Sequence, residues 1–190
     1  MKKMFFALIF CVNITAFSLF AFEAEDLTKY PSAVPANSFA VNIGIGLNYP
    51  KDGNLIVPPL SASVDYNLPI GGLPFFLGGI VGFYSSGEDN SLLGAKYEYT
   101  YSNLDLGFRI GYHFNWDVDG LDTYAVGTFG YQAEWLEWKS GGLSGDDSDG
   151  SLLFGAAVGA RWFFTPVIGV FMELGYSALS FASTGLSIHF

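Results

Sequence analysis

The chain has little charge and almost no cysteine, and each shortage excludes a class of protein. Charged residues make up 14% of its 190 residues, against roughly 25% in soluble domains. The single cysteine is Cys11, near the N-terminus. The rest of the chain can therefore form neither a disulfide framework nor a thiolate metal site, and we expect no metal and no cofactor.

Basic residues are especially scarce, since 8 Lys and Arg stand against 18 Asp and Glu. A protein that binds nucleic acid neutralises phosphates with Lys and Arg. Docking on anionic lipid also needs basic patches. The charge balance argues against both kinds of partner.

The first 24 residues have the layout of a cleavable secretory signal. Lys2 and Lys3 form a positive region, and residues 4–12 are a short apolar run, too short to span a bilayer as a helix. Small residues follow, and cleavage is expected between residues 18 and 24, after Ser18, Ala21 or Ala24. The sequence does not choose among them.

Two further expectations concern this end of the chain. Acylation of Cys11, as in a lipoprotein, is disfavoured because Phe10 is bulky where the lipoprotein peptidase needs a small residue. Residues 25–38, with Pro31 and Pro35, are predicted to be a flexible periplasmic lead-in.

After the signal no apolar run reaches the roughly 20 residues of a membrane helix, although the mean hydropathy is +0.35. Apolar side chains instead recur at every second position, which predicts strands. Eight such segments cover 39–49, 60–68, 75–84, 97–114, 124–138, 152–164, 167–176 and 181–190. Segments of about ten residues suit tilted strands that cross a bilayer.

The composition of the two faces decides where these strands lie. Phe39, Val41 and Ile43 share one face of the first segment, while Asn42 and Gly44 lie on the other. The polar faces are too lightly charged for the outside of a soluble barrel, but small polar residues suit a narrow lumen and apolar ones suit lipid. We therefore predict an all-β protein, an eight-stranded antiparallel up-and-down transmembrane β-barrel over residues 39–190, which pairs every backbone group. The pattern leaves the facing of 124–138 undecided.

The long fourth segment changes phase. Tyr97, Tyr99 and Tyr101 are out of step with the apolar set that begins at Leu104. This predicts either a bulge near Ser102–Asn103 or a strand that projects beyond the membrane.

The stretches between segments are expected to be loops. Residues 50–59, 85–96 and 139–151 are predicted to face outside, and the acidic runs 146–150 and 117–122 are interpreted as solvated turns. Aromatic residues at the expected strand ends, among them Tyr84 and Tyr124, are interpreted as interfacial girdles.

Five charges are predicted to point into the lumen: Asp65, Asp105, Arg109, Arg161 and Glu173. Enclosed charges should pair with one another, because isolated burial is expensive. The structural interpretation is a polar plug, and the functional one is an ion or solute path gated by the arginines. Eight strands leave room only for side chains or one small ligand.

Catalysis is not expected. His113 and His189 both fall at predicted periplasmic strand ends, far from Ser85 and Ser86. A Ser-His pair needs hydrogen-bond reach, so both histidines are interpreted as solvated interfacial residues.

The chain ends in Leu186-Ser187-Ile188-His189-Phe190, with apolar residues two and four positions before a terminal aromatic. Together with the signal and eight amphipathic segments, this ending resembles the small bacterial outer-membrane barrels of the OmpX, OmpA-barrel and OmpW type. The resemblance implies that Leu186, Ile188 and Phe190 are the assembly signal read by the barrel-insertion machinery. It also implies location in the outer membrane, with its lipid as a partner.

The resemblance leaves two functions open. One is a narrow channel or conduit for small molecules, as in OmpW, with the lumen largely plugged by polar side chains. The other is a surface-exposed adhesin or ligand-binding protein that acts on host ligands through its extracellular loops, as in OmpX.

Overall fold

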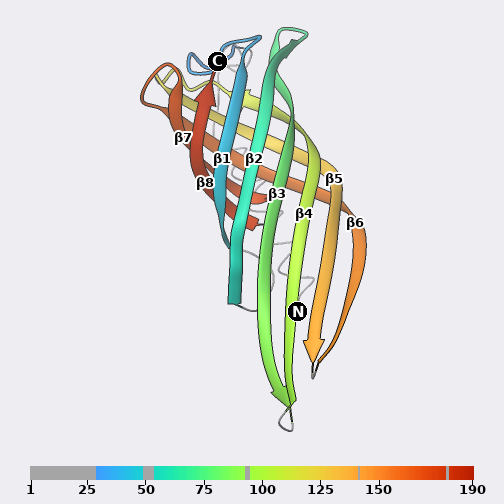
Figure 1. Ribbon diagram of the computed structural model, residues 1–190. Coiled ribbons are helices and arrows are strands. Elements are labelled where there is room, and N and C mark those ends of the chain that lie inside the picture. The colour runs from blue at the N-terminus through green and yellow to red at the C-terminus, as the bar shows by residue number, and fades with distance from the viewer. Residues whose placement is uncertain (1–28, 49–53, 93–94, 141, 179) are drawn as a thin grey trace, which may run out of the picture.

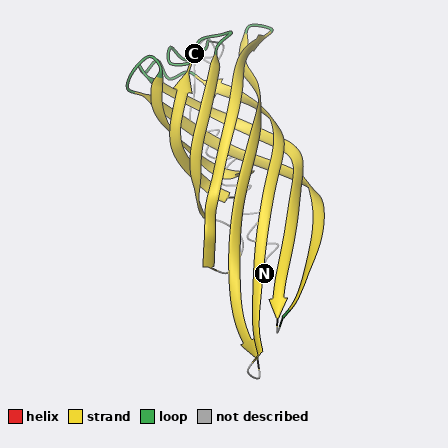
Figure 2. Ribbon diagram, viewed as in Figure 1, coloured by secondary structure: helices red, strands yellow, loops and turns green. Residues whose placement is uncertain are grey.

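The computed structural model describes residues 29–48, 54–92, 95–140, 142–178 and 180–190. Figures 1 and 2 show a twisted ring of strands joined by short connections. The expected signal, residues 1–24, lies outside the described residues, as does the start of the lead-in. Within these ranges no helix is long and apolar enough to cross a membrane.

Eight strands follow one another along the chain. Their bounds are β1 Phe39–Asn48, β2 Asn54–Ile70, β3 Leu73–Leu92, β4 Ala95–Phe114, β5 Leu121–Ser140, β6 Leu143–Phe163, β7 Ile168–Ala178 and β8 Ser180–His189. Each pairs antiparallel with the next, and β8 pairs with β1 to close the ring. The predicted fold class, an eight-stranded antiparallel up-and-down barrel, is confirmed.

The seam between β1 and β8 involves the last residue of the chain. Phe39 N donates to Phe190 O at 2.7 Å and Phe190 N donates to Phe39 O at 3.0 Å. The two rings stack outside with centroids 5.8 Å apart. Both backbone and side chain of Phe190 therefore contribute to closure.

The strands have unequal lengths, and this corrects the predicted loops. β3, β4 and β5 have 20 residues each and β6 has 21, whereas β7 has 11 and β8 has 10. The long strands extend past the others at one end of the barrel (lower part of Figure 1). We call the paired part of β3–β6 at this end, residues 84–92, 95–103, 131–140 and 143–151, the projecting sheet.

The described parts of the outer stretches 50–59, 85–96 and 139–151, predicted as loops, are mostly strand. The acidic run 146–150 pairs residue by residue with β5, as in Asp146 with Glu137 and Gly150 with Ala133. Gly, Ser and Asp are typical of turns, but here they form an edge strand exposed to water, where no apolar alternation is needed. The prediction of turns was wrong for that reason.

The phase change in β4 arises because the first part of this strand lies in the projecting sheet. The register of β4 with both neighbours runs without a shift from Tyr97 to Phe114, so the predicted bulge near Ser102–Asn103 is wrong and the alternative of a projecting strand is right. Tyr97, Tyr99 and Tyr101 share the side of the strand that carries Asn103 and Asp105.

The facing of the barrel strands follows their alternation. On β5, left undecided by the sequence, Asp122, Tyr124, Val126 and Thr128 point inward and are buried. On β4, Phe108 points outward and is 78% exposed, while its neighbour Arg109 is buried. The interior is thus polar and charged, and the exterior is apolar.

One connection and one terminal segment shape the end of the barrel near Phe190. Gly71 and Gly72, both with positive φ, form the two-residue turn between β2 and β3, the geometry of a tight hairpin. Residues 30–38, which we call the mouth segment, belong to the stretch 25–38 predicted as a flexible lead-in, and they contact the end of the barrel. Val34 is fully buried, and Asn37 N donates to Asn67 O at 2.8 Å.

Candidate functional site

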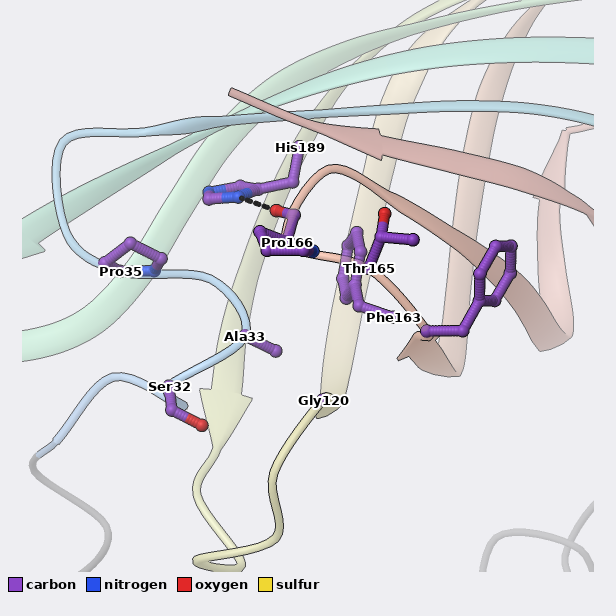
Figure 3. Close-up of a pocket in the computed structure, with 9 residues that line it drawn as sticks. Ser32, Ala33, Pro35, Gly120, Phe163, Thr165, Pro166 and His189 are labelled. Carbon is purple, nitrogen blue, oxygen red and sulfur yellow. Dashed lines mark hydrogen bonds between the residues drawn. The ribbon is translucent and has the colours of Figure 1, made fainter.

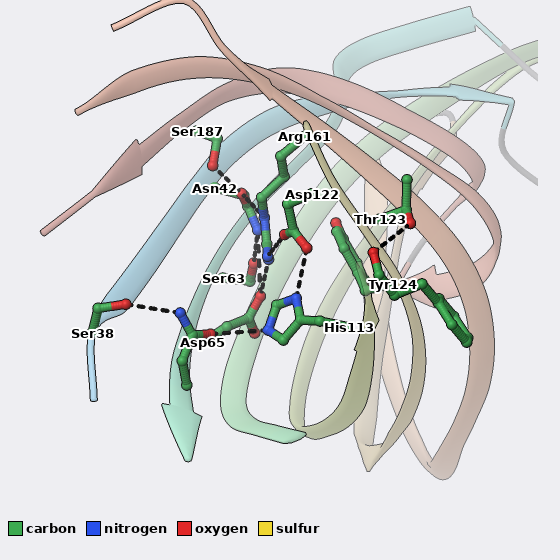
Figure 4. A network of polar contacts seen from close by, with 12 residues as sticks. Ser38, Asn42, Ser63, Asp65, His113, Asp122, Thr123, Tyr124, Arg161 and Ser187 are labelled. Atoms are coloured by element: carbon green, nitrogen blue, oxygen red, sulfur yellow. Dashed lines mark hydrogen bonds and ion pairs between the residues drawn. The ribbon is translucent and has the colours of Figure 1, made fainter. Parts of the chain in front are cut away.

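The lumen is crossed by a cluster of buried polar and aromatic side chains, which we call the lumen network (Figure 4). Every strand contributes to it, and each member is at most 2% exposed. Its members are Asn42, Asp65, Asn67, Phe76, Arg109, His113, Asp122, Tyr124, Arg161, Glu173 and Ser187. They face inward because they share the inward phase of their strands.

Arg161 and Asp65 form the centre of the network. Arg161 donates through Nη2 to Asp65 Oδ2, and through Nη1 to Asp122 Oδ2 at 2.8 Å. Its Nε donates to Asn42 Oδ1 at 3.1 Å. The guanidinium carbon also lies 4.2 Å from the centre of the Tyr124 ring, within the range of a cation–π contact. The buried positive charge of Arg161 is therefore surrounded by two carboxylates, an amide oxygen and an aromatic ring.

Arg109 forms a second layer with Glu173. Its Nη2 donates to Glu173 Oε1 at 2.6 Å and its Nη1 to Oε2 at 3.3 Å, a two-pronged pairing. Arg109 Nε lies 3.1 Å from Asp65 Oδ1, so Asp65 bridges the two arginines. Tyr124 adds a hydrogen bond from its hydroxyl to Glu173 Oε1 at 2.7 Å.

His113 forms the layer nearest the mouth segment. Its Nδ1 lies 2.7 Å from Asp122 Oδ1 and its Nε2 lies 3.0 Å from Asn67 Oδ1. The sequence interpretation of His113 as solvated is wrong, because its ring is completely buried. Asp122, interpreted as part of a solvated turn, is likewise buried, as the second residue of β5.

Glycines on neighbouring strands make room for the rings of the network. A side chain at Gly111 would collide with the Phe76 ring, and one at Gly159 would collide with the Tyr124 ring. Tyr124 was interpreted as a girdle residue, and so was Tyr84, but both are buried. Tyr124 points inward opposite Gly159 and fills space in the lumen. The sequence pattern alone had placed it at the membrane interface.

The structure brings together four of the five predicted lumen charges. Asp65 pairs with both Arg109 and Arg161, and Arg109 also pairs with Glu173. Asp105 is also buried, but it lies four residues along β4 from Arg109, about 13 Å for an extended strand. His113 and Asp122 complete the network and were missed. Their position at strand ends hid them, although His113 does share the inward phase of Arg109.

A cavity of about 450 Å³ lies at the end of the barrel that carries the mouth segment. It is placed between this segment and the connection from β6 to β7 (Figure 3). Ser32, Ala33 and Pro35 line one side, and Phe163 and residues 164–166 line the other. His189 Nδ1 lies 3.4 Å from Pro166 O at its edge. In the part of the chain that the structure describes, no group of three or more His, Cys, Asp or Glu is placed to hold a metal ion.

The predicted C-terminal residues lie on the outside. Leu186, Ile188 and Phe190 point away from the lumen and are partly exposed, and they alternate with Ser187, which is buried and donates to Asn42 Oδ1 at 2.8 Å. The last strand, β8, thus has an apolar face on the outside of the barrel and one polar contact with the lumen network.

Comparisons with known proteins give likeness in fold only. No family model matches the chain, and no curated protein is significantly similar to it. Among solved structures, Ail, the attachment invasion locus protein of Yersinia pestis, is 17% identical with a TM-score of 0.49 over 82% of this chain and 99% of its own. A second structure of Ail, in complex with the heparin analogue sucrose octasulfate, is 16% identical with a TM-score of 0.48 over 82% and 99%.

The N-terminal β-barrel domain of Pseudomonas aeruginosa OprF is 15% identical, with a TM-score of 0.47 over 82% of this chain and 98% of that domain. The strand order, the closed ring and the two kinds of face rest on this chain's own residues. An apolar exterior around a charged, filled interior is the arrangement of a transmembrane barrel. The chain therefore has the fold of the small eight-stranded outer-membrane β-barrels.

Proposed function

We propose that the protein is an integral protein of the bacterial outer membrane whose closed barrel anchors a projecting sheet, and that this sheet binds ligands outside the cell. Of the two functions that the resemblance left open, this is the surface-exposed interaction protein. The conduit for small molecules is the alternative.

The exterior supports location in a membrane. Large apolar side chains on the outside of all eight strands are exposed, for example Ile43, Phe108 and Phe154. A monomer in water rarely exposes a contiguous apolar patch of more than a few hundred Å². An apolar surface of this extent fits lipid as its solvent. A closed ring of strands also leaves no unpaired backbone edge exposed to that lipid.

The filled lumen argues against a conduit. Side chains from all eight strands meet across it, and the central charges Asp65, Arg109 and Arg161 are at most 2% exposed. A solute would have to break several ion pairs at once to pass. Because breaking a buried pair from one side costs several kcal/mol, the network favours a closed barrel at rest.

The length of β3–β6 is the single observation that carries the proposal. A tilted strand needs roughly 9–11 residues to cross a bilayer, yet these strands have 20 or 21. The excess is held as a paired, regular sheet, and a rigid platform of this kind is suited to presenting side chains to a partner.

The charge of the projecting sheet restricts its ligands. The acidic residues described on it are Glu88, Glu98, Glu134, Glu137, Asp146, Asp147 and Asp149, and Lys139 is the basic residue among those whose side chains the structure describes. An acidic surface repels polyanions such as sulfated polysaccharides and attracts cationic ligands. We therefore place cationic protein segments ahead of polyanions as partners.

The His–carboxylate pair found among the described residues of the lumen does not support catalysis. His113 and Asp122 are 2.7 Å apart, as in the base and orienting acid of a hydrolase. The other ring nitrogen, however, contacts the Asn67 side-chain oxygen instead of a nucleophilic hydroxyl. The pair is enclosed, and no group that attacks a substrate lies next to it among the contacts described for this ring.

The proposal is tested by removing the projecting part of β5 and β6. Ala133 pairs with Gly150, so residues 134–149 can be replaced by a two-residue Asn-Gly turn, which suits a hairpin. We expect the variant to insert as a heat-modifiable barrel but to lose adhesion of expressing cells to surfaces that carry lysine-rich peptide. Unchanged adhesion by the inserted variant would overturn the proposal, and a control that replaces Gly71-Gly72 by Asn-Gly at the opposite end should adhere normally.

A further inference from the structure

The two faces of the projecting sheet differ in charge. The register of β3 with β4, β4 with β5 and β5 with β6 runs through the projecting sheet without a shift. One face of the sheet therefore continues the lumen side of the barrel, and we call it the inner face. Lys139 lies on the other face, directly opposite Glu98. On the inner face, the charged residues whose side chains the structure describes are all acidic: Glu88, Glu134, Asp147 and Asp149.

Aromatic side chains lie among these carboxylates. Tyr99 on β4 and Trp138 on β5 stand directly opposite each other on the inner face, and both are partly exposed. A Cβ added at Gly145 would lie 2.6 Å from Trp138 Nε1, so the indole is turned toward β6 and covers this glycine. Tyr97 and Tyr101 are the neighbours of Tyr99 on the same side of β4. Aromatic faces surrounded by negative charge attract cations, because both the ring and the carboxylates favour positive charge.

Two buried oxygens without a hydrogen-bond partner lie where the inner face joins the lumen. Ser86 is fully buried, and its Oγ has no partner among the residues that the structure describes. Asn103 is 1% exposed, and its Nδ2 donates to Tyr84 Oη at 3.0 Å, whereas its Oδ1 has no described partner. Both residues belong to the inner face, since Ser86 stands opposite Tyr101 and Asn103 opposite Tyr84. A buried acceptor without a partner costs free energy, so these oxygens suit a ligand that donates hydrogen bonds.

We infer that the inner face of the projecting sheet recognises arginine side chains of a partner protein segment. One guanidinium group stacks on the rings of Tyr99 and Trp138, and another donates to Ser86 Oγ and Asn103 Oδ1 at the base of the face. Glu134 stands directly opposite Asn103 and supplies negative charge beside the second group. The inference rests on the proposed function, and it specifies which face of the sheet binds and which side chain of the partner is bound.

The arrangement favours arginine over lysine. A guanidinium group is planar and stacks on aromatic rings, whereas an ammonium group is a compact and strongly hydrated charge. Its fork of five N–H donors also serves acceptors on two strands at once. Ser86 and Asn103 are such a pair, because they are diagonal neighbours across β3 and β4, about 7–8 Å apart.

The spacing along β4 indicates how many arginines take part. Tyr99 and Asn103 are four residues apart on this strand, about 13 Å in an extended chain. One side chain does not serve both places, so the partner segment presents at least two arginines. An acidic, partly aromatic face fits such a segment by charge complementarity.

The first test compares oligoarginine with oligolysine of equal length and charge. Their binding to the full-length barrel, inserted in nanodiscs of zwitterionic lipid, is followed by fluorescence anisotropy of a label on each peptide. We expect the dissociation constant of oligoarginine to be at least about fivefold lower, because only the guanidinium group stacks and forks. Equal binding of the two peptides would overturn the inference.

Matched substitutions on β5 locate the binding face. Glu134 and Trp138 lie on the inner face, and Glu137 and Trp135 lie on the other face of the same strand. We expect Glu134→Gln and Trp138→Leu each to weaken oligoarginine binding roughly tenfold, and Glu137→Gln and Trp135→Leu to weaken it less than about twofold. Equal losses on the two faces, or native binding by the inner-face variants, would contradict the proposed recognition.

Ser86→Ala tests the base of the face. Because Ser86 Oγ makes no described hydrogen bond, the substitution should leave unfolding by urea unchanged and reduce the preference for oligoarginine over oligolysine. Ser85→Ala is the control, since Ser85 Oγ donates to Tyr101 O and lies on the other face, so this variant should keep the preference. An unchanged preference in Ser86→Ala would overturn the role of the buried oxygens.

These outcomes are distinct from a failure of the proposed function. Adhesion that survives removal of residues 134–149 contradicts the proposed function itself. Adhesion that is lost on this removal, together with native binding by Glu134→Gln and Trp138→Leu, would leave the projecting sheet as the binding element and reject its inner face as the site.

Discussion

Single residues in the lumen network are held by several partners at once, and Arg161 has the most. It binds Asp65, Asp122 and Asn42 and lies over the Tyr124 ring. With Arg161→Ala both carboxylates lose a partner while staying buried, so we expect the free energy of unfolding to fall by about 3–5 kcal/mol. Unfolding by urea in detergent measures this.

The matched control for that substitution is Lys139→Ala, because Lys139 is exposed on the projecting sheet. Its loss should change the free energy of unfolding by less than about 1 kcal/mol. An equal effect of the two substitutions would contradict the network as a source of stability. It would also mean that Arg161 is surrounded by water in the folded barrel.

At this scale the sequence predicted the inward charges from their strand phase, and it failed at strand ends. Asp65, Arg109 and Glu173 lie in the middle of alternating segments, where one phase must face lipid and the other the lumen. His113 and Asp122 lie next to the turn 115–120, where the same residue types are equally common in water. Asp122 meets Arg161 and His113 through the register of β5 with its two neighbours, β6 and β4, which the sequence pattern alone does not fix.

Among the elements, β8 depends most on the residue that follows it, Phe190. Phe190 exchanges two backbone hydrogen bonds with Phe39 and stacks on its ring. We expect Phe190→Asp to be exported but to fail to insert, because a charge would stand at the apolar seam and the proposed assembly signal, Leu186, Ile188 and Phe190, would be broken. Cell fractionation and the heat-dependent shift in gel mobility measure insertion.

The matched control is Phe190→Tyr, which keeps an aromatic ring that can stack on Phe39 and introduces no charge. It should insert as the native chain does. Normal insertion of Phe190→Asp, or failure of Phe190→Tyr, would contradict the role given to the aromatic at this position.

The elements also show where the sequence ceases to predict structure. Alternation located all eight strands, because each crosses a boundary between lipid and lumen. It underestimated β3–β6, since both faces of the projecting sheet lack a lipid boundary to enforce alternation. Hydrogen bonding to the neighbouring strand, which has no signature in composition, keeps residues 143–151 extended.

The whole molecule is a barrel closed in the middle and extended at one end. Because the network joins strands on opposite sides of the lumen, such as β4 to β7 through Arg109 and Glu173, we expect the native protein to add no measurable conductance to planar lipid bilayers at neutral pH. We expect the same of Arg109→Ala and Arg161→Ala, since Phe76, Tyr124 and the remaining side chains still fill the lumen.

Raised conductance of either arginine variant would contradict this expectation and favour the alternative function, a path gated by the ion pairs. The control is a barrel with Gly127→Ala. Gly127 faces outward and an added methyl group there meets ordinary contact distances, so lumen and conductance should both stay unchanged.

The seam between β1 and β8 has a consequence for the order in which the barrel forms. All other pairings join strands that are consecutive in the chain, whereas this one joins the first strand to the last. Local hairpins close short loops quickly, while a contact between distant segments must overcome the entropy of the whole intervening chain. We therefore expect this seam to be the last pairing to form. Until Phe190 reaches Phe39, the nascent sheet has two free edges, one on β1 and one on β8.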